Sequence, residues 1–273
     1  MTKNEQGILT FFVSKALFFG IITNLLFNLS NENILLTTLL GFTLGTIILF
    51  FLMKYKLIKD NIIFKIIIFI LSIILFIYSI TSLTNIIHTF YLSETPKVLI
   101  ILLILIICIY GSTKNKIGIS RLSEILLPIS LLFIFIALIG NTKNFEINNL
   151  LPIFYNFNSN FIVSTLITTL VSIIPCILLL YLIKEYNIKY IIKGYISSGI
   201  TLLLIILSTL STLGITLSSY FKYSEYISFK KIQLFNFIER IENIVSIYSI
   251  IDYIILLIML VLIIKKIMKK SWY

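Results

Sequence analysis

Long apolar runs separated by short polar segments are the feature that most limits what this chain can fold into. Eight such runs follow one another, at residues 8–28, 33–53, 62–91, 97–112, 121–140, 158–183, 192–220 and 243–264. A helix needs about 20 apolar residues to cross the hydrocarbon core of a membrane, and the runs lack the alternation typical of barrel strands. We therefore predict an all-α polytopic membrane protein with about eight transmembrane helices.

The composition excludes a soluble globular domain. Of the 273 residues, 59% are hydrophobic and 12% are charged, which is about half the charged fraction of a soluble domain. With the N-terminus in the cytoplasm, fifteen Lys and Arg residues lie on the inner side and six on the outer side. The positive-inside rule then predicts cytoplasmic N- and C-termini. This topology explains the net charge of +11, and no basic groove or stacking module indicates nucleic acid as a partner.

Three ionisable residues fall inside predicted spans, where a charged side chain costs at least about 2.5–3.5 kcal/mol on insertion scales. Asp252 is the only charge between Ile244 and Ile264. It is either a cation, proton or ligand site or the structural partner of a polar group on another helix. Lys15 lies well inside the first run, and we expect its ammonium to snorkel to the cytoplasmic headgroups. His88 is expected in the interface region, near the outer end of the third run.

Two clusters of small and polar residues interrupt the apolar runs. Gly20 and Thr23 lie in the first run, and such residues in a membrane helix can mark an unwound segment whose free backbone groups bind a ligand. Ser164, Thr165 and Thr168 lie near the start of the sixth run, where hydroxyls either bind a ligand or join helices. Both clusters are candidate parts of a binding site.

Several chemical signatures are missing from the sequence. It has no Gly-rich phosphate loop followed by Lys and Ser or Thr, no nucleophile elbow and no metal-ligand cluster, and it has one His. We therefore predict no enzymatic activity, no catalytic residues, no metal and no cofactor.

Four short motifs occur in order along the chain. They are Glu94-Thr95-Pro96 after the third run, Arg121 with Glu124 at the start of the fifth, Asn149-Leu150-Leu151-Pro152 before the sixth, and Glu239-Arg240-Ile241-Glu242 at the start of the eighth. In this order and spacing they resemble the B subunit of GerA-type spore germinant receptors, which belong to the amino acid, polyamine and organocation permease superfamily. The resemblance runs over nearly the whole chain.

The resemblance implies a permease-like bundle of two inverted repeats, with a ligand site between broken first and sixth helices. Because the family has ten helices, the chain is expected to be shortened at its C-terminus. It would form a single transmembrane domain over residues 1–273, with a first repeat at about 8–140 and an incomplete second repeat at about 158–264. The resemblance also implies a nutrient germinant as ligand, A- and C-type receptor subunits as partners, and a location in the inner membrane of the spore.

The motifs also have physical interpretations. Pro96 disfavours helical backbone at Thr95, so the Glu94 motif ends one helix and begins the next element. Arg121 and Glu124 are three residues apart and can pair along one helix face. The charged residues before the eighth run either cap a helix or contact a partner subunit, and they are Glu239, Arg240 and Glu242.

The leading hypothesis is a nutrient sensor of spore germination that binds an amino-acid-type ligand without catalysis. The residues expected to hold the ligand are Gly20, Thr23, Ser164, Thr165, Thr168 and Asp252. One alternative is a proton- or sodium-coupled amino acid transporter, in which Asp252 is the coupling site. A second alternative is a non-binding scaffold subunit of a membrane receptor complex.

Overall fold

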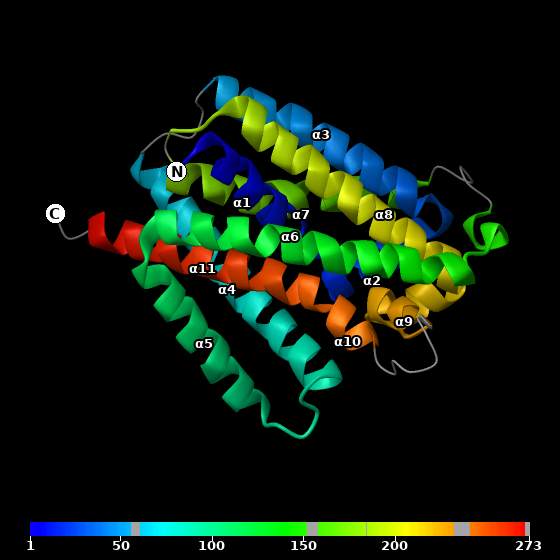
Figure 1. Cartoon of the computed structure of the whole chain (residues 1–273). Helices are drawn as coiled ribbons and strands as arrows, with labels where there is room; N and C mark the ends of the chain where they lie inside the picture. The colour runs from blue at the N-terminus through cyan, green and yellow to red at the C-terminus, as the bar shows by residue number, and fades with distance from the viewer. Residues whose placement is uncertain (56–60, 152–157, 184, 232–240, 271–273) are drawn as a thin grey trace.

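The computed structural model describes residues 1–55, 61–151, 158–183, 185–231 and 241–270. Regular secondary structure in these ranges is entirely helical (Figure 1). The α-helices are α1 (Lys3–Lys15), α2 (Thr23–Ser30), α3 (Ile34–Lys54), α4 (Ile62–Phe90), α5 (Lys97–Thr113), α6 (Asn115–Asn141), α7 (Ser159–Ile183), α8 (Ile188–Tyr220), α9 (Ser224–Lys230), α10 (Ile241–Val245) and α11 (Ile247–Lys270). The predicted all-α class is confirmed.

Six described segments are long and apolar enough to cross a membrane. They are Lys3–Lys54, Ile62–Phe90, Asn115–Asn144, Ser159–Ile183, Ile188–Tyr220 and Ile247–Met268, and the apolar helix α5 is shorter. The first segment contains two predicted runs, which meet at the 3₁₀ turn η2 (Asn31–Asn33) between α2 and α3. Together these segments overlap all eight predicted runs, so the chain is a multi-pass membrane protein.

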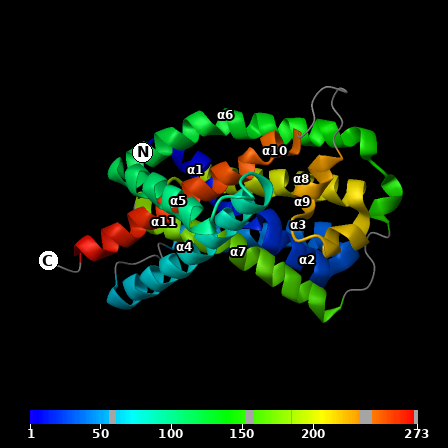
Figure 2. The same cartoon turned by 90° about the horizontal axis from the view of Figure 1, so that it is seen from below.

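The first half-helix, α1, lies inside the bundle. It contacts α6, α7, α8 and α11. On one side of it α3 packs against α7 and α8, and on the other side α4 and α5 pack against α11 (Figure 1). Figure 2 shows α6 running along one edge of the bundle. The end of α1 is therefore surrounded by protein, so polar groups near it must find their partners within the bundle.

The first predicted run is a broken helix. α1 ends at Lys15, and the π-helical turn η1 (Phe18–Ile22) contains two non-helical residues, Phe19 (φ −58°, ψ 119°) and Gly20 (φ 88°, ψ −103°). Glycine adopts a positive φ at little steric cost. α2 then begins at Thr23, so the interruption that Gly20 indicated is present.

A second break lies in α8, where Gly214 has φ 72° and ψ 173°. The resemblance implied that this break would lie in the sixth run, and that expectation is wrong. α7 is helical throughout Ser159–Ile183, with Pro175 inside it. Proline removes one backbone hydrogen bond and bends a helix, whereas the positive φ at Gly214 changes the direction of the chain.

The short motifs found in the sequence are only partly arranged as expected. Pro96 directly precedes α5, so it marks the start of that helix as predicted. Arg121 and Glu124 are exposed on α6, and the predicted pair is not formed, since the salt bridge found among the described residues is between Lys15 and Asp252. Two long exposed side chains gain little from pairing in water, because ordering them costs entropy.

Small residues let α1 and α8 cross at very short range. A Cβ atom on Gly194 would lie 2.0 Å from the carbonyl oxygen of Gly7, and one on Gly7 would lie 2.7 Å from that of Tyr190. Close backbone approach of this kind is typical of helix packing in membranes. The crossing places α1 firmly against the N-terminal part of α8.

We expect Gly194→Val to lower the thermal midpoint of the detergent-solubilised protein, because the added side chain meets backbone that cannot move aside. Overpacking costs about 1–3 kcal/mol, or roughly several degrees for a chain of this size. Ile196→Val, on the exposed face of the same helix, is the matched control and should change little. Equal midpoints for the two variants would contradict the close crossing.

Candidate functional site

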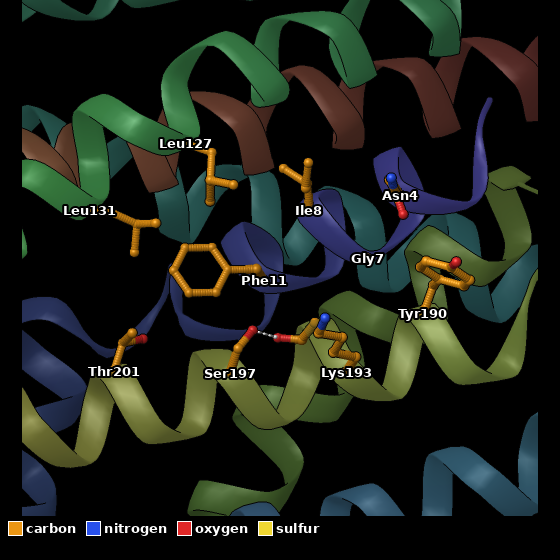
Figure 3. A pocket seen from close by; sticks show the side chains of 11 residues that line it. Asn4, Gly7, Ile8, Phe11, Leu127, Leu131, Tyr190, Lys193, Ser197 and Thr201 are labelled. Atoms are coloured by element: carbon orange, nitrogen blue, oxygen red, sulfur yellow. Dashed lines mark hydrogen bonds between the residues drawn. The ribbon is translucent and has the colours of Figure 1, made fainter.

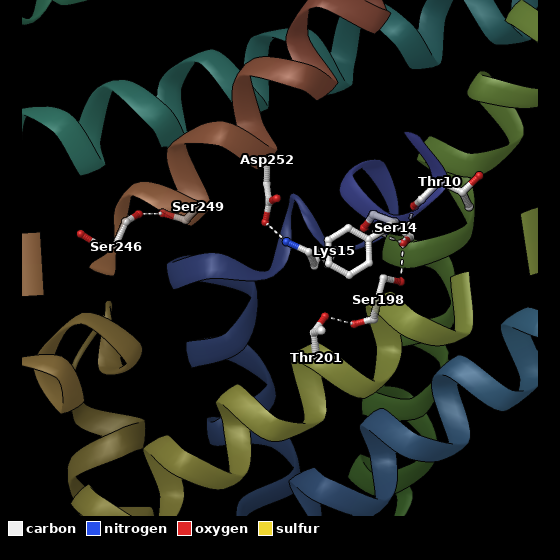
Figure 4. A network of polar contacts seen from close by, with 9 residues as sticks. Thr10, Ser14, Lys15, Ser198, Thr201, Ser246, Ser249 and Asp252 are labelled. Atoms are coloured by element: carbon white, nitrogen blue, oxygen red, sulfur yellow. Dashed lines mark hydrogen bonds and ion pairs between the residues drawn. The ribbon is translucent and has the colours of Figure 1, made fainter. Parts of the chain in front are cut away.

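A buried ion pair closes the end of α1. The ammonium of Lys15 donates a hydrogen bond to Oδ2 of Asp252 on α11, and both side chains are almost fully buried (Figure 4). The Lys15 Nζ also lies 4.7 Å from the ring centre of Phe11 and 5.6 Å from that of Tyr248. Lys15 occupies the last turn of α1, where the helix dipole favours a cation.

The snorkelling predicted for Lys15 is therefore wrong. Its side chain is 3% exposed, because α1 lies inside the bundle and the route to the headgroups is occupied by protein. For Asp252, the structural pairing considered as one alternative is present. Its second oxygen, Oδ1, has no hydrogen-bond partner among the described residues. The carboxylate can therefore accept further hydrogen bonds.

The backbone groups released by the break are bound by side chains from three elements. The Gly20 N–H donates a long hydrogen bond of 3.4 Å to Oε1 of Glu225 on α9. The Tyr253 hydroxyl of α11 donates to the Phe19 carbonyl at 3.4 Å, and the Thr23 hydroxyl donates to the Phe18 carbonyl. A broken helix in a membrane requires such partners, since water is not available to replace the lost bonds.

Glu225 is the functional candidate that the sequence analysis missed. Its side chain is 2% exposed, and Oε2 has no hydrogen-bond partner within the described part of the chain. Burial raises the pKa of the Glu225 carboxyl to about 7, and the hydrogen bond from the Gly20 N–H partly offsets this rise. The available signal was an acidic residue between two tyrosines, Tyr223 and Tyr226, in the segment between the predicted runs 192–220 and 243–264.

Aromatic rings surround the break. Tyr223 fills the space beside Gly20, where a Cβ atom would lie 2.5 Å from the Tyr223 ring. The rings of Phe19 and Tyr248 are 5.9 Å apart, and those of Phe90 and Tyr223 are 5.1 Å apart. Burial, with Tyr78 and Glu225 nearby, raises the pKa of Tyr223 to about 12. We call the set Phe19, Gly20, Thr23, Tyr223, Glu225, Tyr248 and Asp252 the helix-break cluster.

The hydroxyls predicted on the sixth run are used mainly within their own helix. Ser164 and Thr165 both donate to the carbonyl of Phe161, and Thr168 donates to that of Ser164. This face of α7 packs against α3, where a Cβ atom on Gly41 would lie 2.6 Å from Cβ of Thr168. The structure thus brings Gly20 and Thr23 together with Glu225, whereas the three α7 residues lie at the contact between α7 and α3.

The remaining predicted residues are not among the residues that define the cluster. Glu94 and Pro96 are exposed, and His88 and Glu242 are half-buried. Glu239 and Arg240 fall outside the described residues. A partner contact at these positions stays a prediction.

A separate cavity of about 450 Å³ opens between α1, α6 and α8 (Figure 3). Its walls are mostly apolar and include Phe11, Leu127 and Leu131, with Lys193 toward one end and Thr201 toward the other. No member of the helix-break cluster lines it. The cavity therefore provides control positions that are independent of the break.

We expect Lys15→Met to destabilise the protein by about 3–5 kcal/mol, because it leaves the Asp252 carboxylate buried without a counter-ion. Lys15→Met combined with Asp252→Leu should recover most of this loss, since both charges are removed together. Thermal midpoints of the wild type, the two single variants and the double variant in detergent measure the coupling. Losses that simply add in the double variant would contradict a buried pair, and Lys97→Met at the exposed start of α5 is the control.

The described geometry can be compared with known proteins. The family described as spore germination protein matches residues 61–272. Spore germination protein XB of Bacillus anthracis is 31% identical over 119 residues, which cover 42% of this chain and 33% of that protein. No solved structure matches the chain.

The family match includes Glu225 and Asp252 and most of the helices that enclose the break, while Gly20 and Thr23 precede it. The matched segment covers only a third of the length of that relative. The matched family is of the receptor or transporter type and not a known enzyme family. This multi-pass membrane protein belongs to the spore germination protein family.

Proposed function

We propose that this protein is a nutrient-sensing subunit of spore germination, and that it binds a small amino-acid-type nutrient at the helix-break cluster. The observation that carries the proposal is the buried Glu225 carboxylate at the break. One of its oxygens accepts from the Gly20 N–H, and the other has no hydrogen-bond partner among the described residues. A buried acceptor without a partner is costly. A ligand that donates a hydrogen bond to this oxygen removes the cost, and the free energy gained favours binding of the ligand.

The two half-helices of the first run both pack on α7 and α8, but their hydrogen bonds to α8 lie on opposite sides of the break at Gly214. α1 is held by the pair of Lys15 with Asp252 and by a hydroxyl contact of 2.5 Å between Ser14 and Ser198 (Figure 4). α2 is held by Asn24, whose amide donates to the Ser219 carbonyl at 2.7 Å. A ligand bound between two separately attached half-helices changes their relative position, which is a physical basis for a signal.

We further propose that the protein acts in the inner spore membrane with A- and C-type receptor subunits. The exposed positions Glu94, Arg121 and Glu124 are available for such contacts, because they take part in no salt bridge among the described residues. Cytoplasmic termini and a single transmembrane domain remain part of this proposal.

Coupled amino acid transport is the second candidate, and the buried carboxylates of Asp252 and Glu225 favour it. Lys15 already neutralises Asp252, so coupling through Asp252 requires the pair to open. Uptake by proteoliposomes that follows an imposed proton or sodium gradient, and that is lost in Asp252→Asn, supports transport. Ligand binding without gradient-dependent uptake supports a sensor.

We expect the purified full chain to be stabilised against heat by at least one small nitrogenous nutrient from a panel of amino acids and related compounds. Ligand at about 100 times its Kd adds about 2.7 kcal/mol of stability. Gly20→Ala should abolish the shift, because Ala is strained at φ 88° and its Cβ collides with Tyr223. Thr201→Val, in the separate cavity, should retain the shift.

Two outcomes would contradict the proposal. One is a folded wild-type protein that no nutrient stabilises, which indicates a non-binding scaffold subunit. The other is a set of spores lacking this gene that germinate normally with every nutrient tested.

A further inference from the structure

We infer that the group recognised at the helix-break cluster is an ammonium, and that Glu225 selects amines over ligands that carry a carboxylate. This inference rests on the proposed function, because it assumes that the nutrient binds at the break. It narrows the class of nutrient from amino-acid-type compounds in general to amines without a neighbouring carboxylate.

The backbone N–H that could bind a ligand carboxylate already donates to a side chain of the protein. An amide freed by a helix break is an attractive donor to an anion, but the Gly20 N–H donates to Oε1 of Glu225 at 3.4 Å. A carboxylate entering here would have to displace Glu225 from the Gly20 N–H, and it would be repelled by Glu225 whenever that carboxyl is ionised. The chain therefore supplies from its own α9 the anion that a ligand would otherwise bring.

The charged groups at the break include two carboxylates and one ammonium, so one carboxylate lacks a counter-ion among the described residues. Lys15 is bound to Asp252, and Glu225 forms no salt bridge with any described residue. One oxygen of each carboxylate, Oδ1 of Asp252 and Oε2 of Glu225, has no hydrogen-bond partner in the described ranges. Buried charges require a counter-charge and hydrogen bonds, so an ammonium, with several N–H donors and one positive charge, supplies what Glu225 lacks.

The surrounding rings favour an organic cation over a metal ion. Tyr223 lies directly beside Gly20, and Phe19 and Tyr248 pack against each other next to it. Aromatic faces attract alkylammonium groups, whereas hard metal ions need a shell of six or more oxygens. No group of three or more His, Cys, Asp or Glu side chains that could hold a metal occurs among the described residues.

Lys15 shows that this environment accepts an ammonium. Its Nζ lies near Asp252 and within 5.6 Å of the centre of the Tyr248 ring, so a carboxylate and an aromatic ring already bind one ammonium at the end of α1. Glu225 and Tyr223 offer the same two kinds of group at Gly20, and the salt bridge found among the described residues leaves Glu225 without a lysine.

The test compares matched ligands on the purified full chain. Ethylamine, alanine and propionate form one series, and isoamylamine, leucine and 4-methylpentanoate form a second. We expect the amine of each series to raise the thermal midpoint, with a Kd at least tenfold lower than that of the parent amino acid. The carboxylic acid should give no shift.

Glu225→Gln tests the residue itself, because the amide keeps an acceptor for the Gly20 N–H and removes the charge. We expect this variant to weaken amine binding at least tenfold and to narrow the difference between amine and amino acid. Glu124→Gln, which removes an exposed glutamate of α6, is the matched control and should bind amines as the wild type does. The ligand series on the wild type remains decisive even if Glu225→Gln does not fold.

The outcomes separate this inference from the proposed function. Amino acids that bind at least as tightly as their amines, with a shift lost in Gly20→Ala, would overturn the inference and leave the proposed function standing. Sodium or potassium chloride that alone produces a shift dependent on Glu225 would also overturn it, in favour of an inorganic cation site. A folded protein that responds to none of the ligands overturns both.

Discussion

The rest of the structure depends on one constraint, which is that the backbone released at Phe19 and Gly20 must find partners away from water. In a membrane an unpaired N–H or carbonyl costs several kcal/mol, so a broken helix exists only where the surrounding protein replaces its hydrogen bonds. Here Glu225 accepts from the Gly20 N–H and Tyr253 donates to the Phe19 carbonyl. The position of α9 over the break and the depth of α1 in the bundle follow from this requirement.

The same arrangement places three ionisable side chains in the interior of the helix bundle, where a charge is costly. Lys15 and Asp252 neutralise each other beside the break, while the Glu225 carboxylate has one oxygen with no partner among the described residues. Such groups persist in membrane proteins when function requires them. The cluster therefore joins a chemically specific contact with two half-helices that are held by α8 on opposite sides of its break at Gly214.

Much of the fold could be predicted because its signals are local. Each apolar run predicted a helix, since hydrophobic length alone decides whether a segment can cross a bilayer, and Gly20 indicated the break that the structure contains. The site could be predicted only in part. Lys15 and Asp252 were recognised separately as costly charges, but their pairing spans 237 positions in sequence, and no local pattern reveals such a contact. Glu225 was missed because it lies outside the predicted runs, where a charged residue attracts no attention.

The sequence by itself determined the class of protein, the approximate positions of the helices, the broken first helix and, through four short motifs, the spore germination family. Only the tertiary structure decided the roles of the polar residues. Thr165 and Thr168 bond within α7 at its contact with α3, Lys15 turns to Asp252 instead of the headgroups, and Glu225 reaches the break from α9. The physical reason is that the hydrophobic effect acts on each segment separately, whereas a buried charge or hydroxyl is satisfied only by the groups that packing brings to it.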